Sequence, residues 1–238
     1  MSGQTSAFRL VQFLLLALLA GTCAREEKGE ALFTLLPSSR TGVNFSNTLQ
    51  HTETYNAYTF RNFYNGAGVG IGDVNNDGLA DLYFCGNLED NKLYLNRGDF
   101  RFEDATEKAG VACRGVWSTG VSLADVNGDG WLDIYVCKSG DPSGANRHNE
   151  LFINNQDGTF TEQAKAWGIA DLGLSVHAAF FDYDRDGDLD CYLLNNSIRP
   201  VGGYDYRPGQ REIRDTTGGN KLYRNDGGRF TDVSAAAG

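Results

Sequence analysis

Proline, methionine and histidine are all scarce in this chain, which has four prolines, one methionine and three histidines among 238 residues. Glycine, in contrast, is abundant, at 30 residues, and aromatic residues make up 12% of the chain. This balance favours short strands joined by tight turns over a helical bundle. We therefore expect an all-β protein.

Positive charge is also in short supply. The chain has 21 lysines and arginines against 31 aspartates and glutamates, which gives a formal net charge of -10. This sign argues against nucleic acid and against an anionic membrane surface as the main partner. A cation is the better candidate for a ligand.

Long apolar runs are absent except near the amino end, where Leu10–Ala20 follows Arg9. The run has the length of a signal-peptide core and is short for a membrane span. Residues 1–22 are therefore predicted to be an export signal. The sequence LLAGTC, ending at Cys23, resembles a bacterial lipobox in which the cysteine becomes lipidated, and cleavage by ordinary signal peptidase is the alternative. Residues 23–32 would then form a hydrophilic tether.

Three acidic motifs recur along the chain. They read DVNNDGLAD, DVNGDGWLD and DYDRDGDLD and begin at Asp73, Asp125 and Asp182. Each is followed by a similar segment, NKLYLN, NELFIN or NKLYRN, and then by a glycine-bearing turn. A period of about 50 to 70 residues is typical of propeller blades and not of short solenoid turns.

Each repeat unit can be divided into four strands. In the first unit the predicted strands are Ala67–Gly72, Asp81–Gly86, Lys92–Asn96 and Phe100–Ala105. Apolar and polar residues partly alternate along these strands, and Gly, Asn and Asp mark the turns between them. We predict an all-β fold, a partial β-propeller of about three four-stranded antiparallel blades. Each acidic motif would be the first hairpin connection of a blade. A β-sandwich with coincidental acidic turns is the alternative.

The predicted boundaries follow the repeats. They are 33–66 for an N-terminal segment leading into the propeller, 67–110 for the first blade, 111–168 for the second and 169–238 for the third. A propeller needs about four to eight blades to close its ring, and Gly238 matches Gly110 and Gly168, where the earlier units continue into the next. We therefore expect the N-terminal piece of a longer protein. A three-blade protein completed by self-association is the alternative.

The acidic motifs have the composition of calcium loops. A calcium ion takes six to eight oxygen ligands at about 2.3 to 2.6 Å, and a glycine at position 6 permits the sharp turn that wraps it. Position 12 is apolar in all three motifs, whereas an EF-hand needs a glutamate there. We predict about three Ca²⁺ ions, with side chains at positions 1, 3, 5 and 9 and the carbonyl at position 7 as ligands. The three sets are Asp73, Asn75, Asp77, Leu79 and Asp81; Asp125, Asn127, Asp129, Trp131 and Asp133; and Asp182, Asp184, Asp186, Asp188 and Asp190.

Four cysteines follow Cys23, and an even number in an oxidising compartment permits two disulfides. The spacing does not require them. Cys85 and Cys137 each lie twelve residues after the first Asp of their motifs, so we expect them at equivalent strand positions as small buried hydrophobes. The other two are Cys113 and Cys191.

The stretches GVGIGDVNNDGLADLYF, GVSLADVNGDGWLDIYV and AAFFDYDRDGDLDCYLL resemble the FG-GAP repeat, also called the VCBS repeat. The resemblance implies a propeller with calcium in its hairpins, as in integrin α-subunits. More narrowly, LPSSRTGVNFSNTL and YNGAGVGIGDVNNDGLADLYFCGN are similar to exported bacterial proteins that carry a C-terminal ASPIC/UnbV domain, relatives of cartilage acidic protein. The resemblance covers about residues 33–238.

The expected function is calcium-dependent binding or adhesion outside the cell, to an unknown protein or carbohydrate and without catalysis. The protein would be secreted, or held at the cell surface or outer membrane by a lipid on Cys23. A long connection in the third unit is rich in side chains that suit carboxylates, sugars or protein surfaces, and a tolerated surface insertion is its alternative interpretation. The candidate ligand-binding residues there are Arg199, Tyr204, Tyr206, Arg207, Arg211 and Arg214.

The competing functional class is a calcium-dependent extracellular hydrolase, for example on glycans, that uses a loop carboxylate as base. The three histidines, His51, His148 and His177, share no repeat position and belong to no nucleophile motif. The clustered acids are already accounted for by calcium. Both observations favour a non-catalytic protein.

Overall fold

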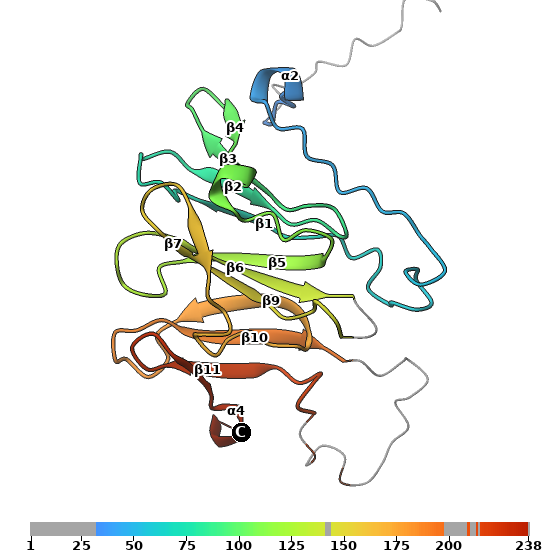
Figure 1. The fold of residues 1–238 in the computed structure, drawn as a ribbon, viewed down its shortest axis with the longest axis vertical. Helices are drawn as coiled ribbons and strands as arrows, with labels where there is room; N and C mark the ends of the chain where they lie inside the picture. Colours follow the sequence, from blue (N-terminus) through green and yellow to red (C-terminus); the bar gives the residue numbers. More distant parts are fainter. Residues whose placement is uncertain (1–31, 141–143, 198–208, 210–212, 214, 238) are drawn as a thin grey trace, which may run out of the picture. The chain divides into compact units, whose positions relative to one another are not determined.

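The computed structural model describes residues 32–140, 144–197, 209, 213 and 215–237. The chain divides into two compact units, Met1–Leu36 and Pro37–Gly238. In the first unit the described residues 32–36 form neither helix nor strand. All the elements shown in Figure 1 belong to the second unit.

The second unit contains three four-stranded antiparallel sheets, each built from four consecutive strands in chain order. This confirms the predicted all-β fold, with the sheets as blades of a partial β-propeller. The first sheet contains β1 (Val69–Gly72), β2 (Asp81–Phe84), β3 (Lys92–Asn96) and β4 (Phe102–Asp104). The second contains β5 (Trp117–Ala124), β6 (Asp133–Ser139), β7 (Glu150–Asn154) and β8 (Phe160–Glu162), and the third contains β9 (Leu174–Phe181), β10 (Asp190–Asn196), β11 (Lys221–Asn225) and β12 (Phe230–Asp232).

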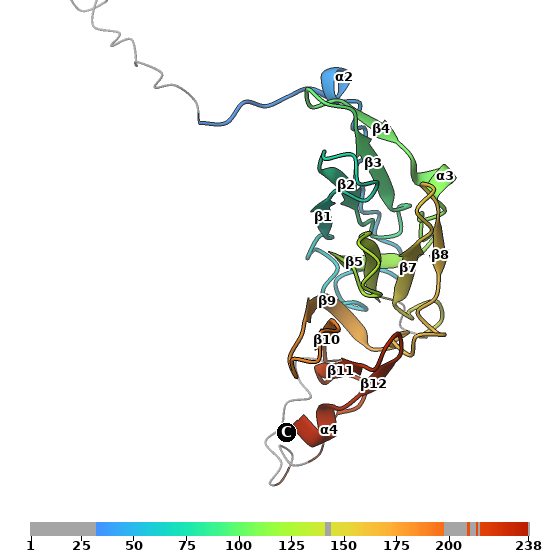
Figure 2. The same cartoon turned by 90° about the vertical axis from the view of Figure 1, so that its left-hand side faces the viewer.

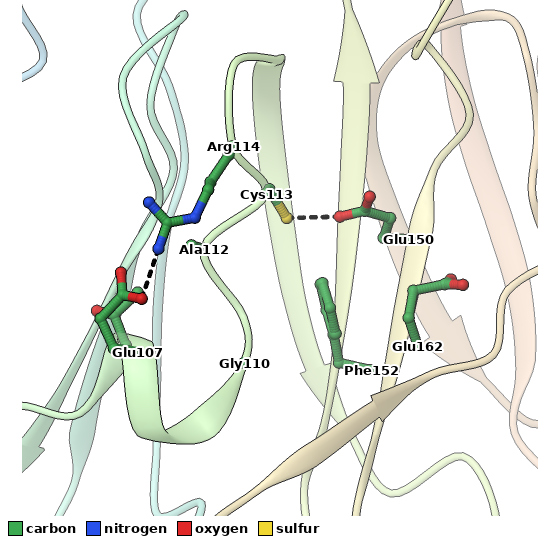
Figure 3. Close-up of a pocket in the computed structure, with 9 residues that line it drawn as sticks. Glu107, Gly110, Ala112, Cys113, Arg114, Glu150, Phe152 and Glu162 are labelled. Carbon is green, nitrogen blue, oxygen red and sulfur yellow. Dashed lines mark hydrogen bonds and ion pairs between the residues drawn. The ribbon is translucent and has the colours of Figure 1, made fainter.

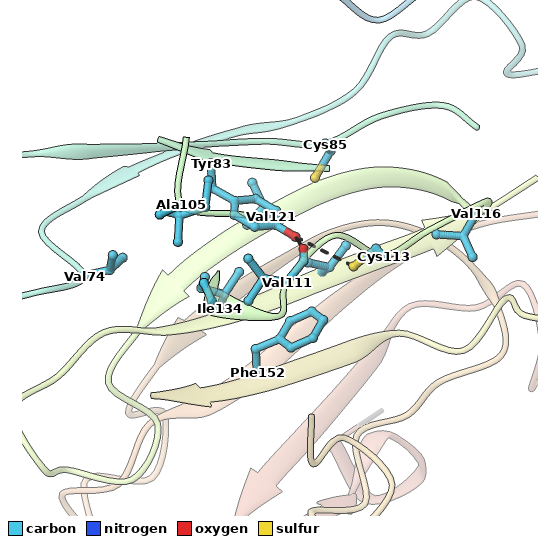
Figure 4. Close-up of a cluster of buried hydrophobic side chains, with 13 residues drawn as sticks. Val74, Tyr83, Cys85, Ala105, Val111, Cys113, Val116, Val121, Ile134 and Phe152 are labelled. Atoms are coloured by element: carbon cyan, nitrogen blue, oxygen red, sulfur yellow. Dashed lines mark hydrogen bonds between the residues drawn. The ribbon is translucent and has the colours of Figure 1, made fainter. Parts of the chain in front are cut away.

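Each sheet has two faces, and side chains alternate between them along every strand. We call the face toward the preceding sheet the leading face, and the face toward the following sheet the trailing face. On the trailing face of the first sheet, Tyr83 and Cys85 pack against Val121 and Ile134 on the leading face of the second (Figure 4). A second buried cluster joins the second and third sheets in the same way. The sheets therefore follow one another face to face within this unit (Figures 1 and 2).

A buried tyrosine ties each of these two faces to the chain segment that leads into the next sheet. The Tyr83 hydroxyl donates to the Val111 carbonyl at 2.6 Å, and the Tyr135 hydroxyl donates to the Ile169 carbonyl at 2.9 Å. Each phenol oxygen also accepts an N–H from an asparagine amide, Asn91 or Asn149. Burial raises the pKa of both tyrosines well above the usual value, so both stay protonated donors.

We call these segments linkers: a short helix precedes the one with Val111, and a turn at residues 164–168 precedes the one with Ile169. Helix α3 (Thr106–Ala109) ends at Gly110, whose φ is 77° and whose N–H donates to the Thr106 carbonyl. Helix α2 (Ser38–Thr41) ends in the same way at Gly42, with φ 78° and an N–H bonded to the Ser38 carbonyl. The left-handed conformation favours glycine. A third helix, α4 (Ser234–Ala237), follows β12.

The four cysteines of the described chain are unpaired and buried. Cys85 follows β2 and Cys137 lies in β6, at equivalent places in the two sheets, as their spacing predicted. Burial raises the pKa of Cys85 to about 12, so its thiol stays protonated.

Replacing Tyr135 with phenylalanine tests the contribution of the buried hydroxyl. Tyr135→Phe removes a bond to the Ile169 carbonyl and the acceptor of one Asn149 N–H, and should lower the free energy of unfolding by about 1–2 kcal/mol. The matched control is Tyr192→Phe, at the same repeat position but 40% exposed, where the loss should be under about 0.5 kcal/mol. Urea denaturation measures both, and equal losses would contradict the assigned role.

Candidate metal centres

The three acidic motifs lie in the hairpins that join β1 to β2, β5 to β6 and β9 to β10. In the first loop the Asp73 carboxylate accepts the N–H of Asp77 at 3.1 Å and of Gly78 at 2.7 Å. The second loop repeats both bonds, from Asp129 and Gly130 to Asp125. In the third, Asp182 accepts from Arg185 and Gly187. The first acid of each motif therefore closes its own loop.

Two positions of each loop adopt positive φ. Position 6 was predicted, and its glycines Gly78, Gly130 and Gly187 have φ values of 84°, 85° and 100°. The positive φ at position 4 was not predicted, because the residues there, Asn76, Gly128 and Arg185, differ in type. Their φ values are 54°, 72° and 67°. Asparagine and glycine tolerate this conformation, whereas arginine is strained in it.

The acid at position 9 has a role that the sequence did not reveal. Asp133 is buried, and its two oxygens accept backbone N–H groups from Val126 inside the loop at 3.0 Å and from Asn154 at the end of β7 at 2.8 Å. Asp81 and Asp190 are also buried and make the equivalent pair of bonds. Burial raises the pKa of Asp133 to about 6, and the two N–H donors oppose that rise. The position-9 carboxylate thus fastens the loop to the third strand of its sheet.

Asparagines at the ends of the third strands connect successive loops. The Asn154 amide donates to the Val74 carbonyl of the preceding loop at 2.8 Å and to the Leu132 carbonyl of its own loop at 3.1 Å. Asn225 does the same with Val126 and Leu189, both at 3.2 Å. The recurring final asparagine of NKLYLN, NELFIN and NKLYRN was the available signal for these residues.

The third loop gathers three carboxylates. Asp182, Asp184 and Asp190 each offer one oxygen, and these oxygens lie within 4.8 Å of one another. Desolvation, and then the charge of Asp186, raises the pKa of Asp184. The donors are all oxygens, and each carboxylate oxygen keeps lone-pair capacity beyond its N–H bonds. The chemistry of this set fits a hard cation such as Ca²⁺.

The first two loops have an asparagine at position 3 in place of Asp184. Asn75 accepts the Asp77 N–H through its oxygen and donates to the Asp77 carboxylate through its amide, both within 3.1 Å. Asn127 and Asp129 repeat the arrangement. The side chains at positions 3 and 5 therefore lie together in both loops.

Position 7 was predicted to offer a backbone carbonyl. The N–H groups of Leu79, Trp131 and Asp188 each donate to the position-5 carboxylate of their loop at 2.9 Å. The Asp188 carboxylate accepts the Gly227 N–H at 3.0 Å. This side chain therefore binds the turn between β11 and β12.

Several predicted sites lie outside the described residues. These are the signal at residues 1–22, the lipidation site Cys23 and the candidate ligand-binding residues Arg199, Tyr204, Tyr206, Arg207, Arg211 and Arg214. Within the described part of the chain, no helix combines the length and the apolar character needed to cross a membrane.

A pocket of about 410 Å³ lies beside α3, the linker that follows it and β7 (Figure 3). Cys113 and Glu150 line it, and the Cys113 thiol donates to the Glu150 carboxylate at 2.6 Å. The buried Lys138 ammonium donates to the other Glu150 oxygen at 2.5 Å. Burial, followed by the charge of Glu150, raises the pKa of the Cys113 thiol well above its usual value. A protonated thiol is a poor nucleophile, and the three side chains form a buried polar contact.

A comparison with known protein families identifies the repeat that contains the acidic loops. A family model described as "FG-GAP-like repeat" matches residues 73–136 and 140–193, which contain the three acidic loops. This chain contains FG-GAP-like repeats. The FG-GAP repeats belong to an extracellular type of protein family.

Two curated relatives carry the same printed name, "Cartilage acidic protein 1". The Xenopus tropicalis protein is 31% identical over 153 residues, which are 63% of this chain and 23% of the relative. The Homo sapiens protein is 41% identical over 136 residues, which are 56% of this chain and 20% of the relative. The FG-GAP repeat chain thus spans about a fifth of the length of these relatives.

Asp133→Asn separates the fastening role of position 9 from any role in metal binding. An asparagine has one acceptor oxygen, so one of the two backbone N–H groups would face an NH₂ group. We expect a loss of about 2 kcal/mol in the free energy of unfolding, measured with a chelator present. Asp129→Asn, at an exposed position of the same FG-GAP loop, should cost under about 1 kcal/mol. Equal losses in chelator would argue against the fastening role.

Arg185→Gly should stabilise the third loop. A left-handed residue other than glycine costs roughly 1–2 kcal/mol, and glycine returns about half of that gain through its unfolded-state entropy. We expect a net gain of about 0.5–1 kcal/mol in thermal or urea unfolding. The reverse change in the second loop, Gly128→Arg, should destabilise the protein by a similar amount, and a neutral result for both would refute the strain.

Proposed function

We propose that the three hairpin loops bind Ca²⁺, about one ion each, and that the ions hold an exported, non-catalytic binding module in its folded form. The observation that carries this proposal is the group of Asp182, Asp184 and Asp190 oxygens within 4.8 Å of one another. The other two loops share its turn and its position-9 bonds.

Like charges at this separation repel one another unless a cation neutralises them. In the third loop the ligating side chains at positions 1, 3, 5 and 9 are all acids, whereas asparagine replaces one of them in the other two loops. We therefore expect the third loop to gain most from calcium. Mg²⁺ fits less well, because it demands stricter octahedral geometry and keeps its water molecules.

Calcium would act on the fold through the residues already described. The first three ligating positions are exposed or half-buried in each loop, whereas the position-9 carboxylate is buried at the start of the second strand. An ion held between them would join the loop tip to the strand. Because it binds the native state alone, it would stabilise the fold by mass action.

The second part of the proposal concerns the partner. FG-GAP repeats and the two relatives support an extracellular binding module, and the acidic charge of -10 supports neither nucleic acid nor an anionic surface as partner. We propose that the protein is secreted or lipid-anchored and binds an extracellular protein or carbohydrate without transforming it. Binding to arrayed glycans and matrix proteins, in calcium and in chelator, would identify the class of partner. Turnover of a bound glycan that is lost in Asp77→Ala would refute the non-catalytic proposal.

Removing calcium should lower the melting temperature. A single site at 100 times its Kd contributes about 2.7 kcal/mol, which corresponds to roughly 5–10 °C for a chain of this size. Differential scanning calorimetry in calcium, in magnesium and in chelator measures the shift. Calcium should give the highest melting temperature.

Variants assign the effect to the loops. Asp182→Asn should remove part of the calcium-dependent shift, while Asp157→Asn, an exposed acid in the turn between β7 and β8, should retain all of it. Elemental analysis gives the number of ions per chain. An unchanged melting temperature in chelator, with no calcium in the purified protein, would contradict the proposed calcium binding.

A further inference from the structure

Two asparagines of this chain, Asn65 and Asn127, are followed directly by glycine. An asparagine in this setting is prone to deamidation, because glycine has no side chain to keep its backbone nitrogen away from the asparagine's Cγ. Asn65 lies before β1 and outside the acidic loops, whereas Asn127 occupies position 3 of the second loop. Both residues are exposed, so solvent water reaches both.

The backbone nitrogen of Gly128 has room to react. Its N–H donates a hydrogen bond to no other group in the described part of the chain, and its φ of 72° is one that glycine adopts without strain. A Cβ built at Gly128 would meet nothing within 4 Å. Neighbouring atoms therefore leave space for the change in conformation that brings this nitrogen to the Cγ of Asn127.

The second loop also supplies a hydrogen-bond donor at the side-chain oxygen of Asn127. The Asp129 N–H donates to this Oδ1 at 3.0 Å. When a nitrogen adds to Cγ, negative charge develops on Oδ1, and a donor already aimed at that oxygen lowers the barrier. The Asn65 side chain, in contrast, makes no hydrogen bond to the residues that the structure describes. The second loop thus combines an unhindered nitrogen with a polarised amide.

The other two loops each lack one of these features. The first loop has the same hydrogen bond, from the Asp77 N–H to the Asn75 side-chain oxygen at 3.1 Å, but Asn76 stands where the second loop has Gly128. The third loop already has an acid, Asp184, at position 3. It still keeps the backbone bonds to its position-1 and position-9 acids. An aspartate at position 3 therefore fits this type of loop.

We propose that the second loop promotes the spontaneous deamidation of Asn127. The Gly128 nitrogen loses its proton to solvent and bonds to Cγ of Asn127, the bond from Cγ to Nδ2 breaks, and ammonia leaves with a proton from solvent. Water then adds to one of the two carbonyls of the resulting succinimide ring and opens it. One opening gives aspartate, and the other gives isoaspartate. The net reaction consumes one water, releases one ammonia and turns the side-chain amide into a carboxyl group.

The two products change the second loop in opposite directions, a consequence that rests on the calcium binding proposed above. Aspartate gives this loop acids at positions 1, 3, 5 and 9, as in the third loop, and the added charge should lower the calcium Kd about tenfold. Isoaspartate lengthens the main chain between positions 3 and 4, which displaces Asp129 from Asp125 and weakens binding. Bound calcium should slow the reaction, because ring closure draws the Asn127 oxygen away from the other ligands.

Peptide mapping by mass spectrometry, after timed incubation of the full chain in mildly alkaline buffer, measures the reaction at each asparagine. With a chelator present, Asn127 should deamidate at least about tenfold faster than Asn75, a factor that corresponds to about 1.4 kcal/mol in barrier height. Asn127 should also react faster than Asn65, and this difference should vanish in urea, where the Asp129 N–H is no longer held at the oxygen. The rate should rise with pH, because the Gly128 nitrogen must lose its proton.

Gly128→Asn is the matched variant, because the first loop has asparagine at this position with a φ of 54°. The variant should fold, which circular dichroism checks, and its Asn127 should deamidate as slowly as Asn75. Asn127→Asp supplies the aspartate product directly. Titration calorimetry with calcium should show tighter binding to Asn127→Asp than to the unsubstituted chain.

Three results would overturn the proposal. One is an Asn127 that deamidates no faster than Asn65 in the folded chain. Another is an equal rate at Asn127 and Asn75, and the third is undiminished deamidation of Asn127 in Gly128→Asn. Equal rates at Asn127 in calcium and in chelator, with the other results as expected, would instead contradict calcium binding at this loop and support the deamidation alone.

Discussion

The position-9 carboxylate is the interaction on which the rest of the structure depends. Asp133 accepts one N–H from inside its loop and one from the end of β7, so it fixes the loop to the strand beside β6 in the sheet. A buried carboxylate is stable only when such donors, or a cation, satisfy it. The same two bonds at Asp81 and Asp190 make this an organising constraint of all three sheets.

The loops and the packing of the sheets are coupled through neighbouring residues. Asn154 donates its backbone N–H to Asp133 and its side-chain amide to Val74 in the preceding loop. A change in one loop therefore acts on the contact between two sheets. This link gives a physical reason why calcium at the loops would stabilise the arrangement of the sheets, in addition to each hairpin.

The packing of one sheet face against the next sheet accounts for which of the equivalent tyrosines are buried and which is exposed. Tyr83 and Tyr135 lie under a following sheet, while Tyr192 has the same asparagine partner and an exposed ring.

The sequence by itself determined the repeat, the order of the strands in each sheet, and the positions of the glycines and acids in the loops. Glycine at position 6 and acids at spacing two are local features, because they act within one turn of the backbone. The strands Lys92–Asn96 and Asp81–Phe84 fell within their predicted ranges for the same reason. Their apolar residues alternate over only a few positions.

Only the tertiary structure decided which atoms those residues meet. Asp133 was predicted as a loop ligand, and its bond to Asn154 joins residues 21 apart in the chain. The strain at Arg185 was invisible because its equivalents are Asn76 and Gly128. Tyr135 is buried under the third sheet, whereas Tyr192 has no sheet over it among the described residues, so the two equivalent tyrosines differ in exposure. Local pattern specifies a blade, whereas burial and hydrogen-bond partners depend on the neighbouring blade that packs against it.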